Sequence, residues 1–226
     1  MTFILSMGIL FFTLREIDDN PKVLESDATT LYVKNNRGRV LWTRQMRYNQ
    51  GQDNLIFKWY QKIVDIDKEE TNEIILAGED EVNLVNKNEI GRVVCLNQFG
   101  EEIWKYNLHD TLTSTLEFLP PYYDFRIIDT VSSFGGQNLI LLSANNYSSF
   151  SSAIFTLDIK TGQRVGETLW HSGHIYGGLV DDINNDNNLE VVFVAINNGY
   201  EKTALGLIEL SKLNGFSPSS FNYYFK

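Results

Sequence analysis

The chain has 226 residues, of which 29 are acidic and 19 are lysine or arginine, giving a net charge of −10. Because a phosphate backbone attracts positive charge, this balance argues against a nucleic-acid partner. The single cysteine, Cys95, excludes an intrachain disulfide, and it lies in the apolar run Val93–Leu96, where we expect a buried thiol. A chain of this length can fold as one all-β domain.

Residues 1–20 are interpreted as an apolar N-terminal segment followed by a polar linker. Phe3–Leu14 is uncharged over about a dozen residues, which is too short to span a bilayer by itself. Its sequence shows neither the alternation of a strand nor the polar face of a helix. We therefore expect a truncated membrane anchor or a signal-like segment, with a buried first strand or a helix packed on the domain as the alternatives. Residues 21–226 are expected to form the folded domain.

Short strand-like runs follow one another from residue 31 onward, which predicts an all-β fold. The clearest repeat is a strand, a glycine turn and a second strand that leads to a tryptophan. Gly38 precedes Trp42, and Gly100 precedes Trp104 in the same way. The repeats are Leu31–Trp42, Val93–Trp104, Ile154–Val165 with Trp170 beyond it, and a fourth that begins at Gly206 and turns near Asn214 and Gly215.

The tryptophans of the first three repeats recur about every sixty residues, a period that indicates propeller blades. Each period has room for about four short antiparallel strands, which make one blade. We therefore expect residues 21–226 to form a β-propeller-like array of about 3.5–4 four-stranded antiparallel blades. A closed propeller needs at least about four blades, so the alternatives are a small propeller and an incomplete one that lacks further blades.

Two acidic stretches run directly into apolar strands, at Ile63–Gly78 and Leu179–Asn198. Both place oxygen-bearing side chains at alternating loop positions, and calcium takes roughly six to eight oxygen ligands in a flexible shell. The spacing therefore predicts bound calcium. The expected ligands are Asp65, Asp67, Glu69 and Glu73 in the first loop, and Asp182, Asn184, Asp186, Asn188 (through its backbone carbonyl) and Glu190 in the second loop.

Neither loop is expected to be an EF-hand. In the second loop, Phe193 stands where that motif has a bidentate glutamate, and a strand follows instead of a helix. Glu70 and Asn187 occupy the sixth position, where glycine is usual. The alternative interpretation is a metal-free polar turn. A third copy, Ile128–Asn145, keeps the strand but has only Asp129 as an acid in its loop, so we expect it to have lost the ion.

These repeats resemble the FG-GAP/VCBS-type β-propeller repeats of bacterial envelope proteins, in which D-x-D-x-D-G-x-x-E loops bind calcium. The resemblance rests on LYVKNNRGRVLW and VVCLNQFGEEIW combined with VDIDKEETNEIILAG and VDDINNDNNLEVVFVAIN. A further segment, IFTLDIKTGQRVGETLW, is similar to the PQQ-like propeller repeat, in which a glycine turn precedes a tryptophan that docks between blades. Together the resemblances cover residues 30–215 and imply structural calcium and a binding surface that varies among members.

The sequence offers little catalytic chemistry. His171 and His174 are spaced like a metal pair, but Ser172 and Gly173 between them predict a turn, which favours histidines that hydrogen-bond a loop. No serine lies in a G-x-S-x-G motif, and no phosphate-binding glycine motif occurs.

We therefore expect a noncatalytic module of the cell envelope, extracytoplasmic and either secreted or anchored through residues 3–14. It would bind a protein or glycan ligand or act as a sensory ectodomain, with structural calcium. One alternative is a carbohydrate-binding or carbohydrate-active protein, which would need exposed aromatic side chains such as Trp59, Tyr122 or Tyr123. A quinoprotein-type oxidoreductase is less favoured, because so few blades cannot surround a cofactor.

Overall fold

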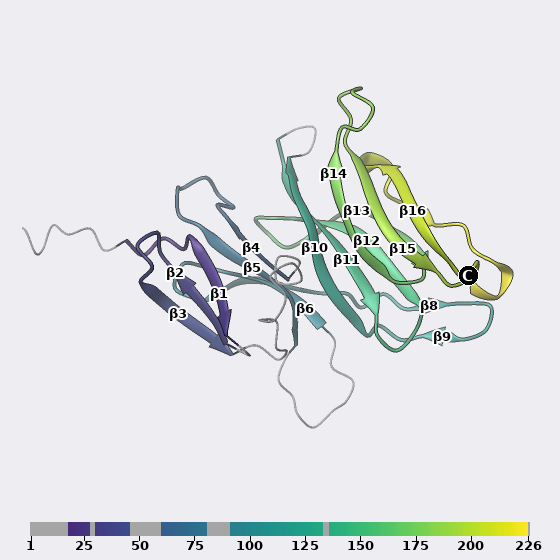
Figure 1. Ribbon diagram of the computed structural model, residues 1–226, viewed down its shortest axis with the longest axis horizontal. Helices are drawn as coiled ribbons and strands as arrows, with labels where there is room; N and C mark the ends of the chain where they lie inside the picture. Colours follow the sequence, from purple (N-terminus) through teal and green to yellow (C-terminus); the bar gives the residue numbers. More distant parts are fainter. Residues whose placement is uncertain (1–17, 28–29, 46–59, 81–90, 133–135, 226) are drawn as a thin grey trace, which may run out of the picture.

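The computed structural model describes residues 18–27, 30–45, 60–80, 91–132 and 136–225 (Figure 1). The apolar segment 3–14 and Trp59 lie outside these ranges. The described residues form strands joined by turns, with two short 3₁₀ helices, which confirms the all-β prediction. A search of the same residues for a helix long and apolar enough to cross a bilayer finds none.

Most strands belong to four antiparallel sheets, which we number in chain order. Sheet 1 contains β1 (Val23–Asp27), β2 (Thr30–Lys34) and β3 (Val40–Gln45); sheet 2 contains β4 (Gln61–Val64), β5 (Glu73–Asp80), β6 (Gly91–Leu96) and β7 (Glu102–Asn107). Sheet 3 contains β10 (Tyr123–Ser132), β11 (Asn138–Asn146), β12 (Ser151–Asp158) and β13 (Arg164–Ser172); sheet 4 contains β14 (Ile175–Asp181), β15 (Glu190–Asn197) and β16 (Lys202–Glu209).

The number of strands per sheet is not uniform. Sheet 2 and the antiparallel part of sheet 3 have the four strands expected of each repeat, whereas sheets 1 and 4 have three in the described part of the chain. A short hairpin, β8 (Leu112–Thr113) and β9 (Phe118–Leu119), follows sheet 2, and β17 (Gly215–Phe216) joins sheet 3 in parallel beside β13. Within the described ranges, none of the sheets closes on itself.

The four sheets follow one another across the molecule in chain order (Figure 1). The central strands are apolar on both faces, as in β11, where every residue after Asn138 is buried. Alternate residues of a strand point to opposite faces, so each central sheet contributes to two separate cores. Sheets 1 and 2 share the core around Leu31 and Ile74, sheets 2 and 3 share the core around Ile75 and Phe155, and sheets 3 and 4 share the core around Leu141 and Phe193.

The same turn is built three times, between β2 and β3, between β6 and β7, and between β12 and β13. Its first residue is Asn35, Asn97 or Asp158, whose side-chain oxygen Oδ1 accepts hydrogen bonds from two backbone N–H groups further along the turn. Each turn contains a glycine in the left-handed region, where other residues are disfavoured. These glycines are Gly38, Gly100 and Gly162, with φ of 76°, 83° and 67°.

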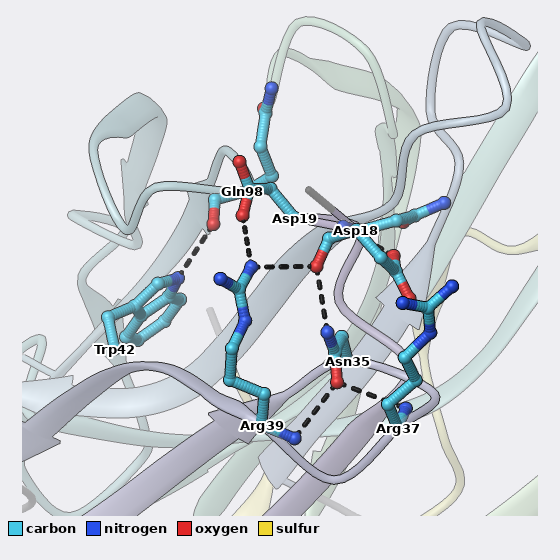
Figure 2. Close-up of polar contacts among 8 residues, drawn as sticks. Asp18, Asp19, Asn35, Arg37, Arg39, Trp42 and Gln98 are labelled. Carbon is cyan, nitrogen blue, oxygen red and sulfur yellow. Dashed lines mark hydrogen bonds and ion pairs between the residues drawn. The ribbon is translucent and has the colours of Figure 1, made fainter. Parts of the chain in front are cut away.

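Two tryptophans dock onto the turn of the next sheet. Trp42 Nε1 donates to the Gln98 carbonyl at 2.9 Å (Figure 2), and Trp104 Nε1 donates to the Ile159 carbonyl at 3.0 Å. The indole rings lie against glycines, because a Cβ added to Gly100 would meet the Trp42 ring at 3.1 Å. Trp104 is only 8% exposed. The predicted docking of a repeat's tryptophan beyond its glycine turn is therefore present at these two junctions.

The third tryptophan departs from this pattern. Trp170 packs against Tyr123 of its own sheet, with ring centroids 6.1 Å apart, and its carbonyl accepts a hydrogen bond from the Ser217 N–H. The reason is that the chain does not turn back beside β16. It forms the 3₁₀ helix η1 (Leu210–Lys212) and then crosses to the edge of β13 as β17.

The C-terminal segment continues along sheet 3 instead of completing sheet 4. Phe225 forms an antiparallel bridge with Ser114, beside the β8–β9 hairpin. It stacks on Phe150 with ring centroids 5.9 Å apart, and Tyr223 meets the same Phe150 edge-on at 4.8 Å. A second 3₁₀ helix, η2 (Phe221–Tyr223), lies within this segment. Residues 215–225 therefore cover one end of the core that sheets 2 and 3 share.

The glycine turns generate a ranked stability prediction. Replacing Gly162 with alanine places a Cβ 2.5 Å from Cε3 of Trp104, whereas the same change at Gly38 meets nothing within 4 Å. Gly38→Ala carries only the left-handed backbone cost of about 1–2 kcal/mol. We expect Gly162→Ala to lower the free energy of unfolding by about 1–3 kcal/mol more, because the core is overpacked.

Denaturant unfolding of the two variants and of Gly100→Ala measures this ranking. Gly100→Ala should fall between the others, because its added Cβ meets the Trp42 ring at 3.1 Å. Gly38→Ala is the matched control, since it has a similar φ without a docked tryptophan. Equal losses at all three positions would contradict the docking of tryptophan as the source of the difference.

Candidate metal-binding loops

Two acidic loops occupy equivalent places in sheets 2 and 4, where each joins the first strand to the second. The first runs between β4 and β5, and the second runs between β14 and β15. Their backbones match at the fourth and sixth positions, which have positive φ in both. Lys68 and Glu70 have φ of 69° and 66°, and Asn185 and Asn187 have φ of 60° and 68°. The loops therefore keep the glycine-type conformation without having glycine.

Hydrogen bonds to the first aspartate of each loop hold this conformation. Asp65 accepts from the Lys68 N–H at 2.6 Å and from the Glu70 N–H at 3.0 Å. Asp182 accepts from the Asp186 N–H and the Asn187 N–H, both at 3.0 Å. In both loops, one oxygen of the first aspartate accepts a hydrogen bond from the backbone N–H of the fourth or fifth loop residue. The other oxygen accepts a hydrogen bond from the N–H of the sixth loop residue. The left-handed residues, which cost about 1–2 kcal/mol each in isolation, are offset by these contacts.

The final glutamate of each loop is buried and points back into the loop. Glu73 Oε2 accepts from the Ile66 N–H at 3.0 Å, and Glu190 Oε2 accepts from the Ile183 N–H at 2.9 Å. Both glutamates begin the second strand of their sheet, so the strand fixes their direction. The repeated spacing in the sequence therefore corresponds to a repeated three-dimensional arrangement.

The first loop gathers three carboxylates. Asp65, Asp67 and Glu73 each offer an oxygen, and these three oxygens lie within 4.8 Å of one another. Calcium–oxygen distances of about 2.3–2.6 Å place the ligands of one ion within about 5 Å of one another, so this donor set fits a hard divalent cation. Glu69, which we expected as a fourth side-chain ligand, is exposed and does not belong to the gathered group.

The second loop has a mixed set of donors. The Asn184 side-chain NH₂ donates to Asp186 Oδ2 at 3.0 Å and lies 3.5 Å from Glu190 Oε1. Its carbonyl oxygen accepts from the Asp186 N–H, and the Asn188 N–H donates to Asp186 Oδ1. The Asn184 amide thus lies between the carboxylates of Asp186 and Glu190, whereas the oxygens of Asp182, Asp186 and Glu190 do not gather within 4.8 Å as those of the first loop do. This loop has an internal hydrogen-bonded arrangement that a cation would have to rearrange.

The electrostatics of the first loop favour a cation. Burial raises the pKa of Glu73, and the negative charges of Asp67 and Asp65 raise it further, against the Ile66 hydrogen bond that lowers it. The pKa of Asp65 is lowered overall, because its backbone hydrogen bonds, chiefly from Lys68 and Glu70, outweigh its partial desolvation. Ionised Glu73 is therefore disfavoured beside its neighbours, and a bound cation would relieve this.

Asp186 in the second loop is held ionised. Its pKa is lowered mainly by the hydrogen bond from the Asn188 backbone N–H, with a smaller contribution from Asn184. A carboxylate that stays charged and exposed at the tip of a loop is a suitable ligand for a hard cation.

The third copy of the loop has a different charge partner. Asp129 lies 3.3 Å from the Lys62 Nζ of sheet 2, and it also accepts from the Thr130 N–H. Asp129 lies within β10 and pairs with a lysine of the neighbouring sheet, and the loss of the ion from this copy stays a prediction. Residues 133–135 of the loop lie outside the described ranges.

One support of the first loop was missed in the sequence. The Asn20 amide donates to the Glu70 carbonyl at 2.7 Å and accepts from the Asn72 N–H at 2.8 Å. Asn72 in turn donates to the Pro21 carbonyl. The chain before sheet 1 thus holds the loop of sheet 2. No local pattern indicates this contact, because about fifty residues separate its partners.

The histidines and the cysteine serve the fold. His171 Nδ1 lies 2.7 Å from Ser217 Oγ and its Nε2 lies 2.9 Å from the Ile196 carbonyl, and burial lowers its pKa. His174 Nε2 contacts two backbone carbonyls. Cys95 is buried, and burial raises the pKa of its thiol to about 12, so it is an unreactive thiol.

Of the aromatic residues named for the alternative carbohydrate-binding function, Trp59 lies outside the described ranges, and Tyr122 and Tyr123 differ in exposure. Trp104 and Trp170 are buried in the core, and Tyr123 is fully buried. Tyr122 stacks on the exposed Tyr147 with ring centroids 5.7 Å apart, and further exposed aromatic side chains, such as Phe221 and Tyr224, lie in the C-terminal segment.

A recess of about 400 Å³ lies between sheets 3 and 4, beside the second loop. One wall is formed by Leu139 and Thr156 of sheet 3. The other is formed by Asn187 and Asn188 of the loop and by Glu209 at the end of β16. A hollow with an apolar floor and polar groups at its rim is a common form of small-ligand site.

Comparison with known proteins adds no family assignment. A scan against protein-family models finds no match, and a search of curated proteins finds none either.

The position of Glu73 generates a pH-dependent prediction in the absence of metal. Because its pKa is raised in the folded protein, Glu73 favours folding at low pH, and this contribution is lost as the pH rises through the raised value. Glu73→Gln removes the ionisation but retains an oxygen for the Ile66 N–H. We therefore expect the variant to be more stable than the parent protein at pH 7 in chelator, and the two to converge near pH 4.

Denaturant unfolding in EGTA between pH 4 and pH 7 measures this difference. The acid end serves as the internal control, because Glu73 is protonated there. A variant that is less stable than the parent at pH 7 without metal would show that the Glu73 carboxylate is stabilising in the empty loop.

Proposed function

We propose that this chain is a noncatalytic β-propeller repeat module whose two acidic loops bind structural calcium. In this proposal it acts as a ligand- or protein-binding or sensory domain on the outer side of the cell envelope. The observation that carries the proposal is that one loop is built twice, with the same positive φ positions and the same buried glutamate, in sheets 2 and 4.

The order of the sheets supports the propeller arrangement. Successive sheets pack face to face, and the tryptophan of one docks onto the glycine turn of the next at two junctions. Propeller blades pack in this way, because a single blade cannot cover its own apolar faces. The resemblance to FG-GAP/VCBS-type and PQQ-like repeats points to the same arrangement.

Asp65, Asp67 and Glu73 would hold the first ion, and Asp182, Asn184, Asp186, Glu190 and the Asn188 carbonyl would hold the second. When bound, calcium neutralises carboxylates that otherwise repel one another. Each loop joins the first two strands of its sheet, so the ion would fix the register of that hairpin. This is a structural role, and it requires no reaction at the metal.

The composition of the loops favours an extracellular setting. Asn184 is neutral, Glu69 is exposed, and the loops satisfy many of their own oxygens by internal hydrogen bonds. These features weaken calcium affinity, and extracellular calcium modules have dissociation constants of about 10⁻⁴–10⁻³ M. Such sites are filled only where calcium is millimolar, outside the cytoplasm.

The recess between sheets 3 and 4 supports a binding role. Asn187 and Asn188 belong both to its wall and to the second loop, so an ion in that loop would also fix this wall. The alternatives are less well supported. The buried tryptophans weaken the carbohydrate-platform hypothesis, and the engaged His171 weakens a catalytic one.

Thermal and denaturant unfolding in millimolar calcium and in EGTA test the proposal. Because millimolar calcium is about one to ten times a dissociation constant of 10⁻⁴–10⁻³ M, each site is expected to add about 0.4–1.4 kcal/mol. Asp67→Asn and Asp186→Asn each remove one carboxylate but keep an oxygen for the loop hydrogen bonds. Each variant should lose part of the calcium response, and the double variant should lose nearly all of it.

Glu117→Gln, an exposed acid remote from both loops, is the matched control and should keep the full response. Magnesium in place of calcium should stabilise far less, because it demands a regular octahedral shell. Identical unfolding of the parent protein in calcium and in EGTA would show that both loops are metal-free turns.

A further inference from the structure

The outer face of sheet 4 is apolar and uncovered in the described structure. On the inner face, Val191, Phe193 and Ala195 are buried against sheet 3. The alternate residues point the other way, and Leu205 and Leu207 are 75% and 62% exposed. We call this the end face of sheet 4, and its residues are Leu179, Val192, Val194, Ile196, Leu205 and Leu207.

The equivalent face of sheet 2 is packed against another sheet. In sheet 2 the pairs that follow the loop glutamate are Ile75 with Cys95 and Ala77 with Val93, and all four are fully buried against sheet 3. In sheet 4 the corresponding pairs after Glu190 are Val192 with Leu207 and Val194 with Leu205. The end face thus has the position and the apolar character of a sheet-packing surface.

The opposite end of the stack has a different chemistry. The outer face of sheet 1 carries Tyr32 with its cross-strand neighbours Glu25 and Thr43, and Glu25 forms an ion pair with Lys34. Apolar leucines placed against this face would desolvate an ion pair without a compensating partner. Head-to-tail contact between the two ends, within one chain or between copies, is therefore unfavourable.

We propose that the end face of sheet 4 is a dimer interface, in which it packs face to face with the same face of a second copy about a two-fold axis. Of the two ends of the described stack of sheets, only this face is apolar, so it matches a second copy of itself better than it matches the outer face of sheet 1. The acids that share this face, Asp181 and Glu209, are the last residues of β14 and β16 and lie at one end of the sheet. The strong net negative charge of the chain therefore does not fall within the centre of the contact.

In a contact about a two-fold axis, the same patch is buried on both copies, so each apolar side chain of the patch contributes buried area twice. Sheets packed face to face lie about 10 Å apart, which is the spacing that Leu205 and Leu207 would fill from both sides. The patch is small for a stable interface, which usually buries about 800 Å² per partner, so we expect reversible dimerisation at about micromolar concentrations. This inference goes beyond the calcium proposal and does not depend on it.

Sedimentation equilibrium of the full chain over a range of concentrations tests the dimer. The parent protein should dimerise, and Leu205→Lys and Leu207→Lys should each raise the dimer dissociation constant by about a hundredfold or more. Because both side chains are exposed, thermal unfolding of the dilute monomers should be unchanged. Leu116→Lys is the matched control, since Leu116 is 63% exposed on the β8–β9 hairpin, and it should dimerise like the parent.

Two results would overturn the inference. One is a parent protein that stays monomeric at high concentration, including a monomer that instead binds lipid vesicles. The other is a dimer that survives Leu205→Lys and Leu207→Lys, or that Leu116→Lys weakens equally. Measurements in calcium and in EGTA separate this inference from the calcium proposal. A protein that dimerises but whose stability does not respond to calcium would support the dimer inference and refute the calcium proposal.

Discussion

The structure depends on sheets that are apolar on both faces. A strand such as β11 alternates side chains between two cores, so sheet 3 is stable only with sheet 2 on one side and sheet 4 on the other. Burial of apolar area supplies about 25 cal/mol per Å², and this term increases with every added neighbour. The tryptophan docked on a glycine turn fixes how closely two sheets approach. At the described outer face of sheet 1 the stack meets water with polar side chains, including the Glu25–Lys34 ion pair.

Features written in short segments of sequence were predictable. The strands, the glycine turns and the spacing of acids in the loops follow from local alternation and from the conformational needs of a few residues. Gly38 and Gly100 are examples, because each was expected in a turn before a tryptophan and each has a positive φ. The spacing of the first loop indicated Asp65, Asp67 and Glu73, whose oxygens do gather, whereas the exposed Glu69 is not in that group, and calcium binding stays a prediction.

Contacts between distant segments were not predictable in this way. The Asn20 amide and the Glu70 carbonyl are fifty residues apart, and Lys62 meets Asp129 across two sheets. Trp170 has the same spacing as the other tryptophans, yet the chain beyond β16 runs to β13 and removes the turn onto which it would dock. The periodicity of the sequence predicts the strands and turns within each repeat. The course of the chain from one repeat to the next depends on packing between distant segments.

The path of the C-terminal segment has a consequence for biosynthesis. Thr115 donates to the Phe221 carbonyl across 106 residues, and the segment that contains Phe221 is translated after all four sheets. On the ribosome, Phe150 and the core beside it therefore remain open to solvent while sheet 4 emerges. Sheet 3 is thus covered at this edge only after residues 221–225 have been translated, although its own strands emerge much earlier.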